Sequence, residues 1–178
     1  MAHIMLDLET LDVTPEAVIL TLGAVKFDPY NVDEDPHTPF YIRFNVDEQT
    51  ALGRTIDPST LDWWAKQPAE VFEEAMSEED RVGLDDATIQ LNKYVANATK
   101  IWAQGPLFDI AMLESLYKMI GKPCPWSYYN VRDSRTVFDM GDDSLKKDNK
   151  TAHNALADAY AQATAVQSIY RQLRVVKK

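Results

Sequence analysis

Three apolar segments near the start of the chain have the pattern of β-strands. Residues 4–8 form a short apolar run, residues 17–27 are rich in Val, Ile and Leu, and residues 40–46 alternate between apolar and polar positions. Pro29 and Asn31 supply turn-forming residues between the second and third segments. Three consecutive strands joined by short turns predict an antiparallel meander.

The pattern then becomes helical. Asp57 followed by Pro58 is typical of a helix start, because aspartate caps free backbone amides and proline suits the first helical position. A helix is therefore predicted through Lys66, and Pro68 ends it. Apolar spacing and turn residues predict the remaining elements in this order: helix 69–76, helix 84–98, strand 100–104, helix 107–120, strand 128–131 and helix 155–173.

This order of elements predicts an α/β fold. The antiparallel meander comes first and strands then alternate with helices, so we expect a mixed sheet flanked by helices. The 178 residues are enough for a single domain spanning residues 1–178. Repeats, low-complexity segments and linkers are not found in the sequence.

Composition favours a cytoplasmic protein that has no membrane segment. No apolar run approaches the roughly 20 residues of a membrane-spanning helix. The first residues lack the basic region of a signal peptide and reach an acid at Asp7. Cys124 is the only cysteine, so it cannot form an internal disulfide, which fits a reducing compartment.

The net charge of −10 argues against an extended grip on nucleic acid, because such proteins normally carry a basic stripe. Two bound divalent cations would offset part of this charge if four of the acids held them. For the acidic segment 73–80 the simpler explanation is solubility.

Asp7 and Glu9 are two residues apart on the first predicted strand. This spacing places both carboxylates on one face of the sheet, with Leu6 and Leu8 on the other. On a central strand the pair would be costly without a cation, because the two charges repel. The alternative is an edge strand whose polar face lies in water.

Asp109 lies near the start of the predicted helix 107–120. Apolar residues follow it at +3, +4, +7 and +11, so Asp109 continues the face of the helix that points to the core. A role as a helix-terminal acid, favoured there by the helix dipole, is the alternative explanation.

Asp158 has a similar position in the last helix, followed by Ala161, Ala165 and Ile169 at +3, +7 and +11. A buried acid that pairs with a hydroxyl group is the alternative. His153 lies five residues earlier, which in a regular helix would place it about 140° away from Asp158. We therefore expect His153 in the loop before the helix, with Asn154 near the cap. A loop histidine suits the activation of water, because imidazole can accept a proton near neutral pH.

These residues resemble a known set. An Asp-x-Glu on the first strand, an aspartate opening a middle helix, and His-x-Ala-x-x-Asp near the end are similar to the three exonuclease motifs of the DEDD superfamily. The histidine five residues before the last aspartate matches the DEDDh branch. The segment 60–64, followed by short helices, looks most like the phage exonuclease A group and its bacterial ribonuclease-like relatives. Gln104-Gly105 departs from the His-Asn that many members have, which affects substrate contacts.

The resemblance implies a ribonuclease H-like fold and a 3′→5′ exonuclease that removes mononucleotides from single-stranded DNA or RNA. It also implies two Mg²⁺ or Mn²⁺ ions, roughly 3.5–4 Å apart in such sites. His153 would act as general base on water, and Asp7 is the expected bridging ligand. The implied ligands of the two ions are Asp7, Glu9, Asp109 and Asp158.

The same resemblance suggests where the substrate lies. Thr10 and Leu11 are expected under the terminal nucleotide. One of Trp63 and Trp64 would stack on a base and the other would join the core, since neighbours in a helix point about 100° apart. Further substrate contacts are expected from Gly105 and Phe108, and phosphate contacts from Arg132, Arg135, Lys146, Lys147 and Lys150.

Other functions stay open from the sequence. A ribonuclease or oligoribonuclease acting on short RNA would use the same site. A nonenzymatic nucleotide-binding module would be expected to lack one ligand, whereas all five positions are filled here. An endonuclease or phosphatase with the same metals differs only in its dependence on chain ends. Glycine-rich phosphate loops, serine nucleophile elbows and zinc spacings are missing from the sequence. A homodimer is possible but has no sequence signal.

Overall fold

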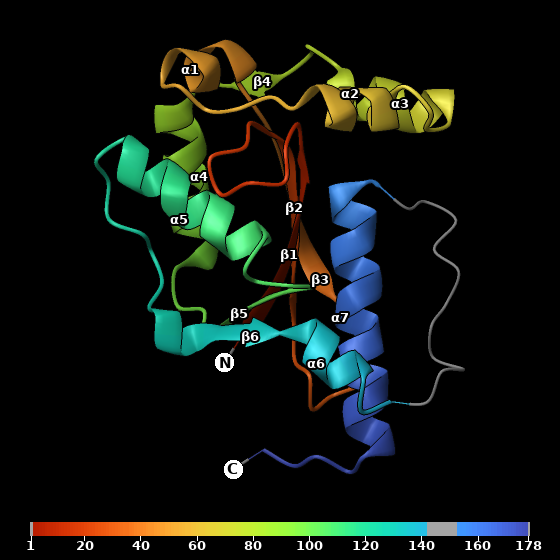
Figure 1. Ribbon diagram of the computed structural model, residues 1–178. Helices are drawn as coiled ribbons and strands as arrows, with labels where there is room; N and C mark the ends of the chain where they lie inside the picture. Colours follow the sequence, from red (N-terminus) through yellow and green to blue (C-terminus); the bar gives the residue numbers. More distant parts are fainter. Residues whose placement is uncertain (1, 142–152, 178) are drawn as a thin grey trace.

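A mixed sheet runs through the centre of the molecule (Figure 1). The computed structural model describes residues 2–141 and 153–177. In this part of the chain the strand order is β4-β3-β2-β1-β5-β6. The strands are β1 (His3–Thr10), β2 (Ile19–Phe27), β3 (His37–Phe44), β4 (Arg81–Val82), β5 (Lys100–Ala103) and β6 (Val131–Asp133). The first three form the antiparallel meander that the sequence predicts, and β4, β5 and β6 each pair in parallel with a neighbour.

Helices cover both faces of this sheet. The helices α4 and α5 lie on one face and α7 on the other, next to α6, while α1, α2 and α3 gather beyond the end of the sheet where β1 finishes (Figure 1). Their bounds are α1 (Val46–Ala51), α2 (Pro58–Trp64), α3 (Ala69–Met76), α4 (Leu84–Val95), α5 (Asp109–Met119), α6 (Ser134–Phe138) and α7 (Ala155–Gln172), with a 3₁₀ turn η1 at Tyr128–Asn130.

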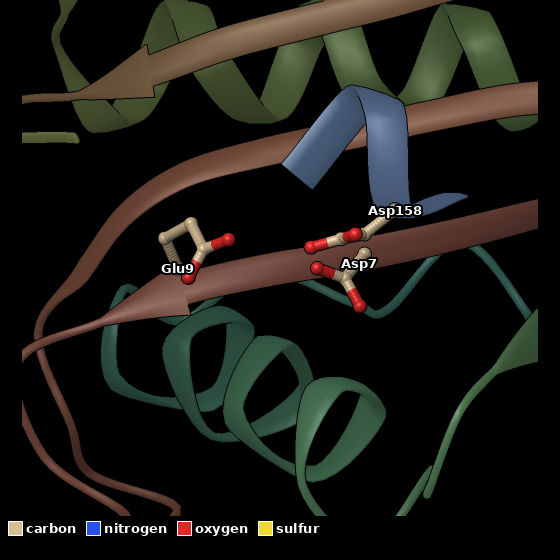
Figure 2. Close-up of side chains that lie close together, drawn as sticks. All are labelled: Asp7, Glu9 and Asp158. Carbon is tan, nitrogen blue, oxygen red and sulfur yellow. The ribbon is translucent and has the colours of Figure 1, made fainter. Parts of the chain in front are cut away.

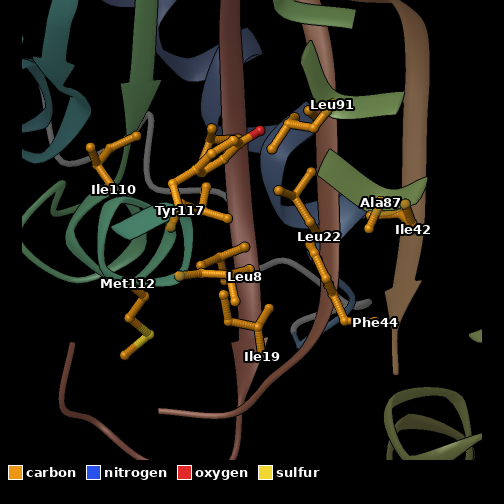
Figure 3. Packing of buried hydrophobic residues seen from close by; sticks show 14 of the residues in the cluster. Leu8, Ile19, Leu22, Ile42, Phe44, Ala87, Leu91, Ile110, Met112 and Tyr117 are labelled. Carbon is orange, nitrogen blue, oxygen red and sulfur yellow. The ribbon is translucent and has the colours of Figure 1, made fainter. Parts of the chain in front are cut away.

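The largest apolar cluster lies between the sheet and the pair α4 and α5. Leu8 and Leu22 project from β1 and β2 toward Met112 and Tyr117 of α5, and all four side chains are buried (Figure 3). Full burial of a side chain of this size contributes about 1.5–3 kcal/mol. Alternation along β1 sends Met5 to the opposite face, where a second cluster packs against α7.

A glycine lets α7 lie directly on the sheet. A Cβ atom added at Gly23 of β2 would collide with the backbone of Ala155 and Leu156, in the first turn of α7. The buried residues of α7 nearest this point are alanines, at Ala155 and Ala159, which also keep the helix close. The first turn of α7 is thereby held against the middle of β2.

Several predicted boundaries change in the structure. The predicted strand 40–46 ends at Phe44, because the side chain of Asn45 accepts a hydrogen bond from the amide of Glu48 and starts α1. The predicted helix 107–120 begins two residues later, at Asp109. Residues 128–130, predicted as a strand, form η1, and the strand β6 follows them. The short elements α1, β4 and α6 were not predicted.

The buried stripe of α7 also differs from the prediction. Ala161 and Ala165 are half-buried, whereas Ala159, Ala163 and Val166 are fully buried. The stripe is therefore rotated by about one residue, roughly 100° around the helix. Asp158, predicted to point at the core, instead lies half-buried at the edge of this stripe.

Within residues 2–141 and 153–177, none of the helices combines the length and the apolar character that crossing a membrane requires.

Candidate active site

Asp7 and Glu9 lie on the same face of a central strand. Leu6 and Leu8 join the cluster under α4 and α5, so the two acids project to the α7 side, as predicted. Strand β1 lies inside the sheet, between β2 and β5, and Asp158 of α7 lies against the face that bears the two acids. An edge strand with its polar face in water is therefore the wrong explanation for this pair. The acids are half-buried at Asp7 and buried at Glu9.

Asp158 joins these two acids from α7. Asp7, Glu9 and Asp158 each offer a carboxylate oxygen, and these three oxygens lie within 4.8 Å of one another. In Figure 2, Asp7 and Glu9 stand on the β1 strand and Asp158 reaches them from the first turn of the helix. Two elements that are far apart in the sequence thus build one compact cluster of oxygen donors.

Asp109 contacts β1 along the strand edge that faces β5. Strand β5 pairs with β1 only as far as Met5. Beyond that point the amide of Leu8 donates a hydrogen bond to Asp109 Oδ1, at 3.1 Å. Asp109 is 3% exposed and is the first residue of α5. The Asp109 carboxylate therefore fixes the start of α5 to β1. Asp109 is not part of the compact cluster of Asp7, Glu9 and Asp158.

The site raises the pKa of its own acids. Burial, together with the charges of Asp109 and Glu9, holds the pKa of Asp7 well above its usual range. Burial and the charges of Asp158 and Asp109 raise the pKa of Glu9 to about 8. Burial raises the pKa of Asp109 to about 7, opposed by the Leu8 amide and by the charge of Arg135. Burial is the main cause of all three shifts, and repulsion from neighbouring carboxylates adds to it for Asp7 and Glu9.

A hard divalent cation fits this donor set. Mg²⁺ and Mn²⁺ prefer carboxylate oxygens, and the three clustered oxygens are close enough to bind one ion together. A cation would also offset the repulsion that, together with burial, raises the pKa values of Asp7 and Glu9. The residues that could hold a metal are therefore Asp7, Glu9 and Asp158. Asp109 lies close enough for its charge to act on Asp7 and Glu9.

His153 lies in the loop just before α7, as the spacing predicts. Its backbone has a positive φ of 70°, and its amide donates a 2.8 Å hydrogen bond to Asp158 Oδ2. Asn154 caps the helix by accepting a hydrogen bond from the amide of Ala157. Asp158 therefore holds the loop that carries His153. This hydrogen bond maintains a backbone conformation that non-glycine residues seldom adopt.

Two tryptophans of α2 pack around His153. The ring centroid of Trp63 lies 4.7 Å from that of His153 with the planes nearly perpendicular, and Trp64 lies farther away at 6.4 Å. Trp64 is 1% exposed, and its indole N–H donates to the carbonyl of Thr10, at 2.9 Å. Trp63 is 40% exposed. Of the two tryptophans, only Trp63 is exposed to solvent.

The remaining predicted substrate contacts lie around the ends of β1 and β5. Thr10 and Leu11 are buried, and Leu11 packs in the same cluster as Trp64. Phe108 is half-buried against the cluster under α5. Gly105 has a positive φ of 101° in the loop before α5.

Of the five basic residues predicted to contact phosphate, the structure describes Arg132 and Arg135. Arg135 donates to the carbonyl of Gln104, at 3.3 Å, and its charge acts on Asp109, so it borders the site. Arg132 is engaged with the carbonyls of Tyr129 and Val131. The other three predicted contacts, Lys146, Lys147 and Lys150, lie outside the described residues.

Two residues at the site were not predicted. Gln162 donates a hydrogen bond to Asp7 Oδ1, at 2.8 Å. It lies four residues after Asp158, one helical turn away on the same face, and this spacing could have identified it. Gly23 is the direct cross-strand partner of Asp7, a pairing that the sequence does not reveal.

Comparisons with known proteins indicate the family and the fold of the chain. Residues 2–170 match the family described as the 3′-5′ exoribonuclease Rv2179c-like domain. An exodeoxyribonuclease of Enterobacteria phage T4 is 26% identical over 195 residues, which cover 89% of this chain and 84% of that protein. The structure of S. pombe Pop2p in its Mg²⁺- and Mn²⁺-bound form superposes with a TM-score of 0.65 at 14% identity, over 96% of this chain and 83% of that chain. This last likeness is one of fold, and it confirms the predicted ribonuclease H-like architecture.

Proposed function

The chain belongs to the Rv2179c-like family of 3′-5′ exoribonuclease domains, and from this premise we propose that it removes mononucleotides from the 3′ ends of single-stranded RNA by divalent-metal-dependent hydrolysis. The family makes it a nuclease of the DEDD type. The observation that carries the proposed mechanism is the cluster of Asp7, Glu9 and Asp158, whose oxygens lie within 4.8 Å of one another on a central strand and its covering helix.

In this proposal the acids hold Mg²⁺ or Mn²⁺, with Asp7, Glu9 and Asp158 as direct ligands and Asp109 beside them. Bound metal would supply Lewis acidity, activating water and stabilising the oxygen that leaves. Two ions would account for all four acids. The buried position of Asp109 and its bond to the Leu8 amide keep that fourth carboxylate next to β1, where it would be available as a further ligand.

His153 serves as the general base in this proposal. Its imidazole takes the proton from the attacking water, and the backbone bond to Asp158 keeps the loop close to the acid cluster. Contact with the Trp63 ring limits how far the imidazole can turn. A change in the contact with Trp63 would alter the rate of hydrolysis more than the binding of the cation.

The exposed aromatic residue beside His153 is Trp63. Trp63 is partly exposed next to His153, so we propose that it stacks on the terminal base, an interaction worth about 1–3 kcal/mol per base. Trp64, Thr10 and Leu11 form the buried floor under this position. Arg135, on the β5–β6 side, would contact a phosphate.

RNA is the proposed substrate because the family is one of exoribonucleases, while the phage relative carries the name of an exodeoxyribonuclease. Short RNA and single-stranded DNA are therefore the alternatives to compare. A metal-dependent endonuclease or phosphatase would use the same acids, and only dependence on a free 3′ end separates it from the proposed activity.

The test is digestion of 5′-labelled single-stranded RNA and DNA oligonucleotides with Mg²⁺ or Mn²⁺, with products resolved by length. We expect a ladder that shortens one nucleotide at a time, faster on RNA, and no cleavage of the same RNA with a blocked 3′ end. Internal fragments from the blocked RNA would contradict the exonuclease assignment. Faster loss of DNA would contradict the RNA preference alone.

A further inference from the structure

Gln162 has one satisfied and one unsatisfied polar atom. It lies in the second turn of α7 and is 9% exposed. Its Nε2 donates to Asp7 Oδ1, at 2.8 Å. Its Oε1 is buried and has no hydrogen-bond partner among the residues that the structure describes. Buried side-chain oxygens in native proteins nearly always have a partner, so an unpaired one next to an acid cluster needs an explanation.

The orientation of the amide follows from its neighbour. A carboxylate that binds a cation is ionised and only accepts hydrogen bonds, so the NH₂ group of Gln162 faces Asp7 in the metal-bound site. The carbonyl oxygen then points to the other side, where no group of the described chain donates to it. The natural donor beside a carboxylate cluster that binds a cation is a water molecule in the hydration shell of that cation, since Mg²⁺ and similar ions usually keep several waters.

We propose that Gln162 is a positioning residue of the metal centre. Its NH₂ group fixes the rotation of the Asp7 carboxylate, and its Oε1 accepts a hydrogen bond from a metal-bound water. Residues that hydrogen-bond to metal ligands, without touching the metal, commonly orient those ligands and tune the affinity of the site for the metal. The proposal rests on the metal use proposed above, but it concerns binding of the ion, not the choice of substrate.

Gln167 provides a matched control on the same helix. It is also buried, and its Nε2 donates to the carbonyls of Asp28, Asn31 and Glu34 at 3.1, 2.8 and 2.9 Å. Gln167 therefore holds the loop between β2 and β3 and has no contact with the acid cluster. Its replacement should affect stability and leave the metal centre unchanged.

The experiment compares Gln162→Met and Gln167→Met with the wild-type chain. Mn²⁺ affinity is measured by calorimetry, and the melting temperature is measured in chelator and in Mn²⁺. For Gln162→Met we expect Mn²⁺ affinity to fall about 10- to 100-fold, the usual effect of losing such a residue, with a smaller metal-induced rise in melting temperature. For Gln167→Met we expect wild-type affinity and a lower melting temperature in chelator.

Wild-type Mn²⁺ affinity in Gln162→Met would overturn the proposal and leave Gln162 a packing residue. If that variant does not fold, Gln162→Ala, which removes the side chain without introducing bulk, takes its place, and the same outcomes apply. Wild-type protein that binds Mn²⁺ but does not shorten RNA would contradict the proposed function, while the comparison of the two glutamines would still decide the role of Gln162.

Discussion

Asp7 and Gly23 face each other across β1 and β2 as direct cross-strand partners. The backbone of Ala155 and Leu156, at the start of α7, packs directly against Gly23. Because side chains of directly opposed residues share a face of the sheet, the helix start lies beside the Asp7 carboxylate. The absence of one side chain thus allows Asp158 to reach the two acids of β1.

Gly23→Ala tests this relationship, because the contact with α7 reverses the sign of the expected change in stability. Alanine in a strand normally stabilises by about 0.5–1 kcal/mol relative to glycine. Here the added carbon collides with main-chain atoms of α7, so we expect a lower melting temperature and weaker Mn²⁺ binding. Ala24→Gly, at the next position and on the opposite face, is the control; it should lower stability without changing Mn²⁺ affinity. A stabilised Gly23→Ala variant would show that α7 does not rest there.

Removal of one acid should abolish turnover and spare the fold. We expect Asp7→Asn and Asp158→Asn to lower the rate by at least about 10³-fold, because each removes charge that holds the cation. Asn at position 7 can still accept the hydrogen bond from Gln162, so the loss would reflect charge. In chelator the melting temperature should stay equal or rise, since the acids repel each other. Retention of more than about a tenth of the activity at saturating metal would contradict the ligand assignment.

The metal-free protein should become less stable as the pH rises. The pKa of Glu9 is raised from 4.5 to about 8, so the folded chain keeps a proton that the unfolded chain loses. The free energy of unfolding therefore falls as pH increases through this window. Melting in chelator from pH 5 to pH 8 measures the trend, and Glu9→Gln should reduce it. In Mn²⁺ the affinity should instead increase with pH, because binding releases protons. Identical pH profiles for wild type and Glu9→Gln would contradict the raised pKa.

Replacement of His153 should slow hydrolysis and leave metal binding intact. We expect His153→Ala to lower the rate by about 10²–10⁴-fold, the range typical of a general base. The side chain lies outside the compact acid cluster, so calorimetric Mn²⁺ affinity should be retained. His153→Gln keeps a polar side chain and should be no more active than His153→Ala. Loss of a bound metal in either variant would identify His153 as a ligand and contradict its role as base.

Binding of nucleic acid should depend only weakly on salt. The net charge is −10, and among the described residues the charge of Arg135 acts on Asp109 of the site. Each neutralised phosphate contributes about −0.7 to the log–log salt slope for single strands, so we expect a slope shallower than about −3 and distributive degradation. Binding of Asp7→Asn to oligonucleotides of increasing length measures this. Arg135→Ala should make the slope shallower, whereas Arg171→Ala, at the far end of α7, should not. Affinity that increases steadily with length would reveal an extended basic groove.

Much of the fold could be predicted because its elements carry strong local signals. The meander follows from apolar runs, and Asp57 caps α2 as predicted, with its side chain accepting from the amide of Thr60. The loop position of His153 follows from helical geometry alone. The Asp7 and Glu9 spacing placed both acids on one face, because alternation along a strand is independent of its neighbours.

Features that depend on tertiary contacts could not be predicted. The sequence does not show that β5 stops pairing at Met5 and leaves the Leu8 amide to Asp109. The rotation of the buried stripe on α7 depends on where Gly23 lets the helix rest, which requires the register of β1 and β2. Short elements such as α1 depend on a single cap at Asn45, a weak signal beside the strong alternation before it.

The hydrogen bond between Asp7 and Gln162 joins residues 155 positions apart in the chain. Closure of a loop of this length costs conformational entropy, which the packing of α7 on the sheet must offset. During synthesis Asp7 and Glu9 of β1 are translated long before α7, which carries Asp158, the third acid of the cluster. The cluster is complete only when α7 has packed on the sheet, so a polypeptide that lacks this helix would lack both Asp158 and Gln162 and could not assemble the centre.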